Sequence, residues 1–283
     1  NLPNTHIYKL GIITNGYIIQ RIPMFILAFF KIKWNLPKDC KKLYFCAFGF
    51  DCLLLAHLCG IKKGIYEIGD LISLNFLTTF VRFIEKKLLS QKRYIVLTSP
   101  GFISSYDDII SPSRIYFIEN KLNNYFTSLR PQTKQFTSER IVIGVIGLLR
   151  FEKPIRMLLE FVKNNSSRFI INCYGDGPLR NLFCESDSEA IRYFGAFKNP
   201  DDLLRIYSEI DINFVVYDNS NNNVRLALPN KLYESAFFGV PLFVAEDTSL
   251  SEIIIEHDIG ETVSLKSQED FEKPFKLINS DKL

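Results

Sequence analysis

The sequence predicts an α/β protein of two domains, each built on a parallel β-sheet. Short apolar runs alternate along the chain with helix-like stretches, which is the pattern of βαβ units. Residues 127–139 (TSLRPQTKQFTSE) interrupt this alternation with a polar segment that contains a proline, as interdomain linkers do. The 283 residues suffice for two modest domains with buried cores. We therefore expect a first domain over 1–126, a linker over 127–139 and a second domain over 140–283.

The individual elements follow from apolar periodicity. In the first half we expect strands at 43–48, 64–68, 94–98 and 115–118, and helices at 51–59 and 76–92. In the second half we expect strands at 141–146, 169–174, 191–194, 212–216 and 242–245, and helices at 155–163, 201–208, 230–238 and 250–256.

Composition excludes several classes of protein. Apolar residues make up 47% of the chain and charged residues 23%, which is a globular balance and argues against disorder. The six cysteines form no CxxC pair and have no metal-ligand spacing with the three histidines, so we expect reduced thiols and a cytoplasmic location. No signal peptide is recognisable, and the apolar run at 24–30 is too short to span a bilayer.

Charge is unevenly distributed along the chain. Residues 1–93 carry 14 Lys and Arg against 5 Asp and Glu, whereas residues 94–283 carry 20 against 26. A basic half rich in aromatic residues suggests an anionic partner surface. Residues 21–34 (RIPMFILAFFKIKW) and 80–93 (FVRFIEKKLLSQKR) have the composition of interfacial helices, and no nucleic-acid motif accompanies them. We expect peripheral contact with an anionic membrane; the alternative is that 25–30 is core and the lysines form a solvated face.

Ligands of parallel sheets bind at the carboxyl ends of the strands, so the residues after each strand are the candidates for a site. Gly147 follows the strand at 141–146 and permits a tight turn. Arg150 and Lys153 come next, close to the start of a helix, and this arrangement suits a diphosphate. A basic surface loop is an equally good interpretation of this segment alone.

The strand at 169–174 is followed by Gly175, Asp176, Gly177 and Pro178. Gly175 and Asp176 are candidate ligand-binding residues by this position; the alternative is a strand-to-helix turn, of which the glycines and the proline are typical, with Asp176 as its cap. The segment is not a GxGxxG fingerprint, so a nicotinamide cofactor gains no support from it.

The third segment, 228–241, is the most informative. Asn230 is placed to cap a short helix, and Leu232 lies on its buried side. Lys231 and Glu234 are three residues apart and share a face. The helix start with Lys231 suits phosphates, and Glu234 is able to accept hydrogen bonds from both hydroxyls of a ribose. The alternative is an exposed ion pair of little energetic consequence.

These three segments, in this order, resemble the retaining nucleotide-sugar glycosyltransferases of family 4, which have the GT-B fold. The resemblance runs from about residue 141 to 263, and its most specific part is Asn230-Lys231-Leu232-Tyr233-Glu234. That form looks most like enzymes of bacterial capsule, O-antigen and exopolysaccharide assembly. The resemblance implies two Rossmann-like domains facing across a cleft. It also implies transfer, with retention, of a sugar from a nucleoside diphosphate to a hydroxyl of a lipid-linked saccharide.

For single residues the resemblance implies that Lys153 and a nearby arginine neutralise the donor diphosphate, and that Glu234 binds the donor ribose. Leu148 stands where the family often has that arginine, and Arg150 is the expected substitute. Leu226 stands where the family has a further glutamate that contacts the sugar. We expect Arg225, or the backbone of 226–229, to orient the sugar in its place.

The first half matches the family less well. The segment 66–71 resembles a strand end where relatives place a histidine before an aspartate, but Gly69 occupies the histidine position here. Asp70 is the candidate acceptor-site residue, with a turn cap as the alternative. The chain begins at Asn1, whereas relatives usually carry further N-terminal strands and a glycine-rich turn. We therefore expect the first domain to be incomplete at its N-terminus.

Other functions remain open. No Asp-x-Asp follows an apolar strand, so we expect no metal, and cationic side chains would stabilise the departing diphosphate. His6, His57 and His257 fit no catalytic triad. A nucleotide-sugar epimerase would need acid and base carboxylates that the sequence hardly offers. A catalytically silent GT-B-like scaffold is a further alternative, which the missing acid at Leu226 favours.

Overall fold

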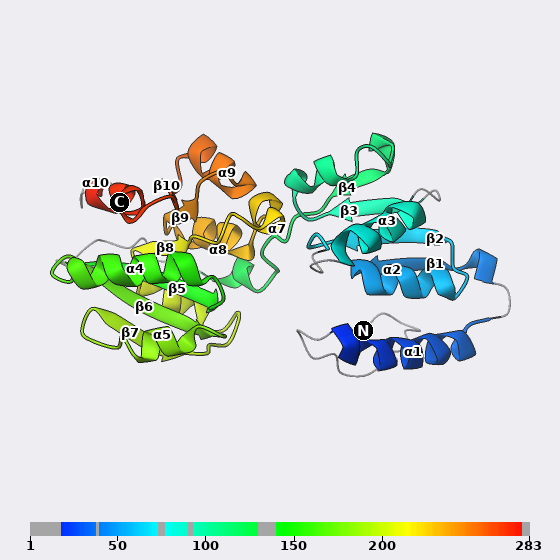
Figure 1. The fold of residues 1–283 in the computed structure, drawn as a ribbon, viewed down its shortest axis with the longest axis horizontal. Helices are drawn as coiled ribbons and strands as arrows, with labels where there is room; N and C mark the ends of the chain where they lie inside the picture. Colours follow the sequence, from blue (N-terminus) through cyan, green and yellow to red (C-terminus); the bar gives the residue numbers. More distant parts are fainter. Residues whose placement is uncertain (1–17, 38–39, 73–76, 90–92, 130–139, 279–283) are drawn as a thin grey trace. The chain divides into compact units, whose positions relative to one another are not determined.

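The computed structural model describes residues 18–37, 40–72, 77–89, 93–129 and 140–278 (Figure 1). The chain divides into two compact units, Asn1–Ile118 and Glu119–Leu283. Each unit contains one parallel sheet, so the prediction of an α/β protein with two parallel-sheet domains is confirmed.

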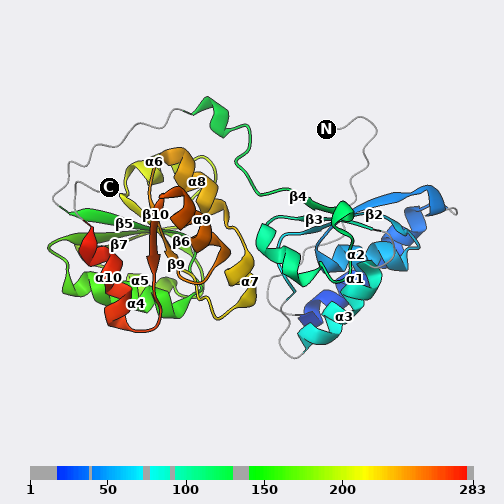
Figure 2. The same ribbon diagram turned by 90° about the horizontal axis from the view of Figure 1, so that it is seen from above.

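The first unit has a four-stranded sheet in the order β1-β2-β3-β4. Its strands are β1 (Tyr44–Phe48), β2 (Lys63–Ile68), β3 (Tyr94–Leu97) and β4 (Ile115–Phe117). Because strand order equals chain order, right-handed crossovers place their connections on one face of the sheet. The helices α1 (Ile18–Asn35), α2 (Gly49–Leu58) and α3 (Thr78–Leu89) form a layer on that face, with α2 in contact with both of the others (Figure 2).

The two faces of this sheet differ in exposure. Residues that alternate toward the helices are buried: Ala47, Tyr66, Ile68, Ile95 and Leu97. Their neighbours on the opposite face include exposed apolar side chains: Tyr44, Phe48, Ile65, Tyr94 and Tyr116. Parallel sheets are usually covered on both faces, so this face is an apolar surface of the first unit.

One buried carboxylate lies under the helix layer. Glu85 of α3 is fully buried and accepts hydrogen bonds from the hydroxyls of Tyr66 (2.6 Å) and Tyr106 (3.3 Å). Burial raises the pKa of Glu85, and the hydrogen bond from Tyr66 and the charge of Arg82 oppose that shift.

The second unit has a six-stranded parallel sheet in the order β10-β9-β8-β5-β6-β7. Its strands are β5 (Ile141–Leu148), β6 (Phe169–Asp176), β7 (Ile191–Gly195), β8 (Ile212–Val215), β9 (Leu242–Ala245) and β10 (Gly260–Val263). The chain runs outward from β5 to β7 and then returns to β8 on the other side of β5. The strand order therefore reverses between β5 and β8, which is where doubly wound folds bind ligands.

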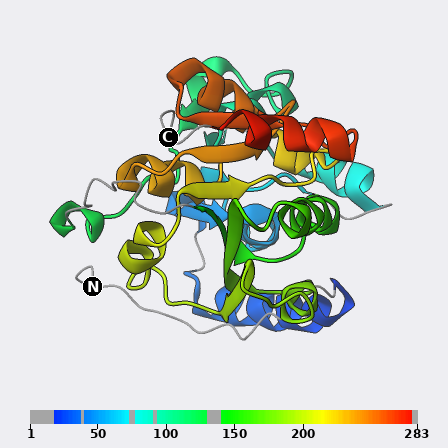
Figure 3. The ribbon, with the colours of Figure 1, turned by 90° about the vertical axis from the view of Figure 1, so that its left-hand side faces the viewer.

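Helices cover both faces of this sheet (Figure 3). On one face lie α4 (Glu152–Asn164), α5 (Arg180–Cys184) and α10 (Gln268–Leu277). On the other lie α6 (Leu203–Ser208), α8 (Asn230–Phe238) and α9 (Ser249–His257), with the short α7 (Asn222–Leu226) before α8.

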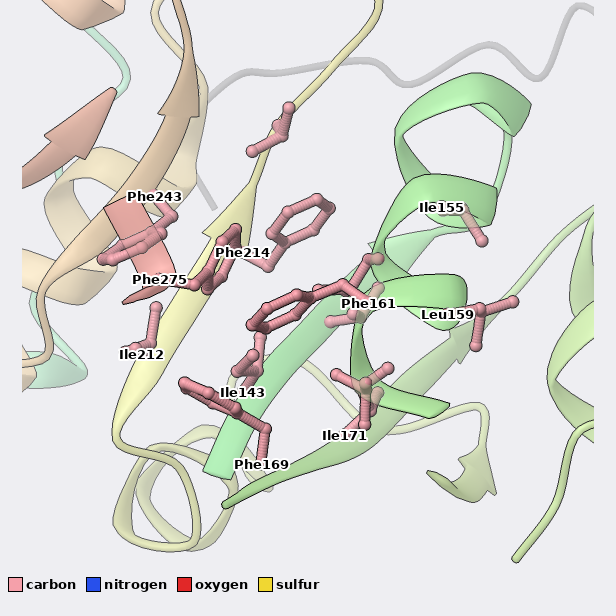
Figure 4. Close-up of a cluster of buried hydrophobic side chains, with 14 of the residues drawn as sticks. Ile143, Ile155, Leu159, Phe161, Phe169, Ile171, Ile212, Phe214, Phe243 and Phe275 are labelled. Atoms are coloured by element: carbon pink, nitrogen blue, oxygen red, sulfur yellow. The ribbon is translucent and has the colours of Figure 1, made fainter. Parts of the chain in front are cut away.

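The core on the first of these faces explains why the flanking segments are helical. In α4 the buried residues Ile155, Leu158, Leu159 and Val162 recur at helical spacing. Phe161 of the same helix packs between Phe169 of β6 (ring centroids 5.0 Å apart) and Phe275 of α10 (4.9 Å), as Figure 4 shows.

The segment after β4 packs with the second unit. The ring of Phe126 is 5.5 Å from that of Phe237 and 6.2 Å from that of Phe238, both in α8. The structure thus divides the chain before Glu119, whereas the sequence suggested a boundary at 126. Residues 130–139 of the expected linker lie outside the described part of the chain.

None of the described helices is long and apolar enough to cross a membrane. The six cysteines are present as free thiols.

Candidate functional site

Near the carboxyl ends of β5 and β6, a pair of glycines leaves the backbone without side chains. Gly147 and Gly175 are register partners in these two strands. A Cβ atom on Gly175 would lie 1.9 Å from the carbonyl oxygen of Gly147, so only glycine fits there. Gly147 has a φ of 117°, which also favours glycine. The turn that follows β5 is thus open to the approach of a ligand.

Lys231 and Glu234 lie beside this turn as a buried ion pair. Lys231 Nζ is 2.6 Å from Glu234 Oε2, and the two side chains are only 11% and 4% exposed. A Cβ atom on Gly147 would lie 3.9 Å from Cε of Lys231, which places the pair at the reversal between β5 and β8. The ammonium group also lies 5.8 Å from the ring centroid of Phe197.

The start of α8 differs from the sequence expectation in one detail. The cap position is Pro229 and not Asn230, which is the exposed first residue of the helix. Proline has no side-chain acceptor, so no side chain caps the first turn. The amide groups of that turn keep their capacity to bind an anion.

A buried polar network holds the carboxylate of Glu234. The hydroxyl of Tyr207 in α6 donates to Glu234 Oε2 (3.0 Å). Asn213 of β8 donates through Nδ2 to the Tyr207 hydroxyl (3.1 Å) and to Ser235 Oγ (2.8 Å). Burial, and then the charge of Glu234, raise the pKa of Tyr207 well above its ordinary value. Tyr207 is thus held as a neutral donor.

Arg150 is connected to Tyr217 through the ring of Phe151. Its guanidinium lies over the ring of Phe151 (4.8 Å), which stacks on Tyr217 at a centroid distance of 4.8 Å. Burial raises the pKa of Tyr217 to about 12; the charge of Arg150 opposes this shift and that of Glu234 adds to it. The charges of Arg150 and Glu234 thus act on the Tyr217 hydroxyl in opposite directions.

Lys153 and Arg150 also line an open groove at the start of α4. The groove has a volume of about 790 Å³, and Arg156 and Lys266 contribute two further cations to its wall. Arg156 is paired with Glu152 at 2.7 Å. Lys153 and Arg150 are exposed, and with Arg156 and Lys266 they outnumber the two carboxylates of the lining, Glu152 and Asp218.

The other predicted residues differ in burial and in their contacts. Asp176 is exposed and accepts a hydrogen bond from the backbone N–H of Gly177 (2.8 Å), so it caps its own turn. Leu226 ends α7, and Arg225 beside it is exposed. Asp70 belongs to the first unit, where it lies exposed just after β2. Leu232 packs in the core behind α8.

Sequence reasoning missed Tyr207, Asn213, Phe197 and Tyr217. Asn213 had a usable signal, because a polar residue inside an apolar strand needs a buried partner. The other three are ordinary aromatic residues, and only the fold brings them to Lys231, Glu234 and Arg150. Within the described ranges, no three or more His, Cys, Asp or Glu side chains gather closely enough to hold a metal ion.

Comparison with known proteins supports the same fold. No family model matches the chain. A succinoglycan biosynthesis protein, ExoL of Rhizobium meliloti (strain 1021), is 25% identical over 277 residues, covering 89% of this chain and 68% of the relative.

Solved structures match both units at low identity. Sucrose-phosphate synthase from Thermosynechococcus elongatus has a TM-score of 0.69 at 12% identity, covering 96% of this chain and 72% of its own. Anabaena Alr3699/HepE, in complex with UDP and glucose, has a TM-score of 0.66 at 11% identity, with coverages of 94% and 75%. The lipopolysaccharide outer core galactosyltransferase WaaB has a TM-score of 0.62 at 13% identity, with coverages of 91% and 71%.

The sequence motifs, the two parallel sheets and these likenesses agree. The chain has the GT-B glycosyltransferase fold, like that of the retaining family 4 enzymes, and is a distant homologue of a succinoglycan biosynthesis protein.

Proposed function

We propose that this protein is a glycosyltransferase that moves a sugar from a nucleoside diphosphate to a hydroxyl acceptor in the synthesis of a bacterial surface polysaccharide. The observation that carries the proposal is the buried Lys231–Glu234 pair beside the open turn at Gly147. It supplies one cation and one carboxylate where a doubly wound sheet binds nucleotides. A solved structure of this fold is a complex with UDP and glucose, and the distant homologue acts in succinoglycan biosynthesis.

The diphosphate of the donor lies, in this proposal, between the start of α8 and the basic groove. Negative charge develops on the diphosphate as the sugar leaves. Arg150, Lys153 and the uncapped amide groups of α8 stabilise that charge by hydrogen bonds and by Coulomb attraction. Because Arg150 and Lys153 are cationic and the amide groups carry partial positive charge, the reaction we propose requires no metal ion.

Glu234 binds the donor ribose, and transfer proceeds with retention at the anomeric carbon. Two ribose hydroxyls are natural donors to a carboxylate. Arg225 and the backbone of residues 226–229 orient the sugar, because Leu226 has no polar group to do so. Asp70 contributes to acceptor binding from the first unit.

The acceptor we propose is a lipid-linked saccharide, reached from the cytoplasmic face of the plasma membrane. Exposed apolar residues recur every four positions along α1: Ile22, Ile26, Phe30 and Trp34, the last 91% exposed. On α3, Phe80 and Phe83 are exposed beside Lys87. Apolar stripes on a unit with a large excess of Lys and Arg suit peripheral contact with anionic lipid.

Donor hydrolysis tests the enzymatic proposal. The full chain is incubated with UDP-, GDP-, ADP- and dTDP-sugars, and release of free sugar is measured. We expect hydrolysis of at least one donor, and a loss of about 100-fold or more in Glu234→Ala, since two hydrogen bonds to a charged group are removed. Asp270→Ala, which changes an exposed carboxylate of α10, serves as the control and retains the activity.

A scaffold without catalytic activity would give a different result. It would release no sugar from any donor, with or without Glu234. That outcome would contradict the proposal and would favour a silent GT-B-like partner domain.

A further inference from the structure

Both hydrogen bonds that described residues make to the Glu234 carboxylate end on the same oxygen. Tyr207 and Lys231 each donate to Oε2, at 3.0 Å and 2.6 Å. A carboxylate has acceptor sites on both of its oxygens. The arrangement therefore occupies Oε2 and leaves the acceptor sites of Oε1 for a ligand.

The direction of the Tyr207 proton is set by Asn213. A phenol has one proton to donate, and the Tyr207 oxygen already accepts from Asn213 Nδ2. The proton is thereby committed to Glu234. Were Asn213 to present its carbonyl oxygen to Tyr207 instead, it would compete with Glu234 for that proton. In the observed orientation Nδ2 also donates to Ser235 Oγ.

The ring of Tyr207 is fixed as firmly as its hydroxyl. It stacks on Phe238, with centroids 4.6 Å apart and an interplanar angle of 15°. Phe238 lies four residues after Glu234 in the same helix, so ring and hydroxyl both engage α8. The Tyr207 hydroxyl is engaged by Glu234 and Asn213, and the Asn213 amide nitrogen by Tyr207 and Ser235, so both residues act on a ligand through Glu234.

We infer that Tyr207 and Asn213 are positioning residues for nucleotide recognition, which hold Glu234 so that its Oε1 selects the hydroxyls of the donor ribose. This rests on the proposed role of Glu234 as the ribose ligand. The relay takes one residue from each of three elements: Asn213 from β8, Tyr207 from α6 and Glu234 from α8. Ribose selectivity thus depends on groups that the ribose does not touch.

The test is the ratio of dissociation constants for a deoxygenated and an ordinary nucleotide. Calorimetry compares UDP with 2′,3′-dideoxy-UDP, and GDP with 2′,3′-dideoxy-GDP, on the full chain. We expect the wild type to prefer the ribonucleotide about tenfold or more. In Tyr207→Phe, which keeps the stacked ring, and in Asn213→Leu the preference falls to about twofold, because Glu234 is no longer held.

Tyr174→Phe is the matched control. Tyr174 is 1% exposed and belongs to the same core cluster as Tyr207. Its hydroxyl also donates to a glutamate, Glu209, and its ring is also stacked, on Phe194. The control also loses a hydrogen bond from a tyrosine to a glutamate, although Glu209 is 37% exposed, and it retains the wild-type preference for ribose.

Each alternative outcome identifies what has failed. If Tyr207→Phe and Asn213→Leu weaken both nucleotides by the same factor, the two residues serve only stability and the inference is wrong. If the wild type binds UDP and dideoxy-UDP equally, Glu234 does not bind the ribose hydroxyls. The inference about Tyr207 and Asn213 is then wrong as well, because it rests on that role of Glu234. If none of UDP, GDP, ADP and dTDP binds, the proposed function itself has failed.

Discussion

At the scale of single residues, burial distinguishes two ion pairs that otherwise share their geometry. Lys231–Glu234 and Lys273–Asp270 both join residues three apart in a helix, and both have N–O distances of 2.6 Å. The first pair is almost fully buried, whereas the side chains of the second are 62% and 35% exposed. Removing one partner of a buried pair leaves an uncompensated charge in a region of low dielectric.

We therefore predict unequal costs for the same substitution. Lys231→Met lowers the free energy of unfolding by about 3 kcal/mol, because Glu234 is left buried and unpaired. Lys273→Met leaves it unchanged within error, because water screens the exposed pair. Urea denaturation followed by circular dichroism measures both variants. Equal effects would mean that the Lys231–Glu234 pair is hydrated and not a preorganised part of a site.

Glu85 gives a prediction for pH. Its pKa is raised in the folded state, so the folded protein keeps a proton that the unfolded chain releases. Stability from this group is present below the unfolded pKa, near 4.5, and is lost as pH rises above it. Glu85→Gln keeps an acceptor for Tyr66 and removes the titration. Urea denaturation at pH 4.5 and pH 7 measures the free energy of unfolding of both proteins. We expect the free energy of the variant, relative to that of the wild type, to be higher at pH 7 than at pH 4.5. A difference that does not change with pH would refute this.

At the scale of elements, the sequence predicts most of the strands and helices and misses several elements, including the last strand and the last helix. The expected bounds of β9 and α8 agree with the structure, because Pro241 marks the start of β9 and Gly239 marks the end of α8. The five-residue helices α5 and α7, the helix α10 and the strand β10 were not predicted. In β10 (GETV) only one residue is strongly apolar, and its pairing with β9 makes it a strand. Tertiary pairing outweighs local pattern in such segments.

The α1 helix contains a natural fluorescent probe for the proposed membrane contact. Trp34 is the sole tryptophan of the chain and lies on the exposed apolar stripe of α1. Vesicles containing phosphatidylglycerol are expected to shift its fluorescence to the blue, and vesicles of phosphatidylcholine alone much less, because binding needs both apolar and charge contacts.

Two variants separate the stripe from general surface hydrophobicity. Phe30→Ser, within the stripe, is expected to reduce the shift at least about threefold, because it removes apolar area worth roughly 25 cal/mol per Å². Ile255→Ser changes an equally exposed residue of α9 in the second unit and is expected to leave the shift unchanged. Emission that does not respond to anionic vesicles would remove membrane contact from the proposal.

At the scale of the whole molecule, the division of the chain has a measurable consequence. Phe126 is 5% exposed and packs on α8, so the segment from Glu119 to Leu129 belongs to the second unit. A fragment that begins at Glu119 is predicted to be about 3 kcal/mol more stable to urea than one that begins at Arg140, because the shorter fragment uncovers Phe237 and Phe238. Phe126→Ala in the longer fragment reproduces most of that loss. Equal stability would place the segment outside the core.

The sequence predicts only some of the residues of the candidate site, because the others are brought there by packing between elements. Motif spacing placed Gly147, Lys231 and Glu234 after strands or at a helix start, and parallel-sheet topology brings such positions together. The side chains that hold Glu234 come from α6 and β8, where no motif marks them. Their roles depend on packing between elements, which a pattern along the chain does not encode.

The central claim is that the second unit binds a nucleoside diphosphate at the Lys231–Glu234 pair. Titration calorimetry of the full chain with UDP, GDP, ADP and dTDP tests it most directly. We predict that at least one of them binds, and that Glu234→Gln weakens this binding about tenfold or more, because a neutral amide replaces a charged acceptor. If none of the four binds to the wild type, or if Glu234→Gln binds as tightly as the wild type, the claim is contradicted.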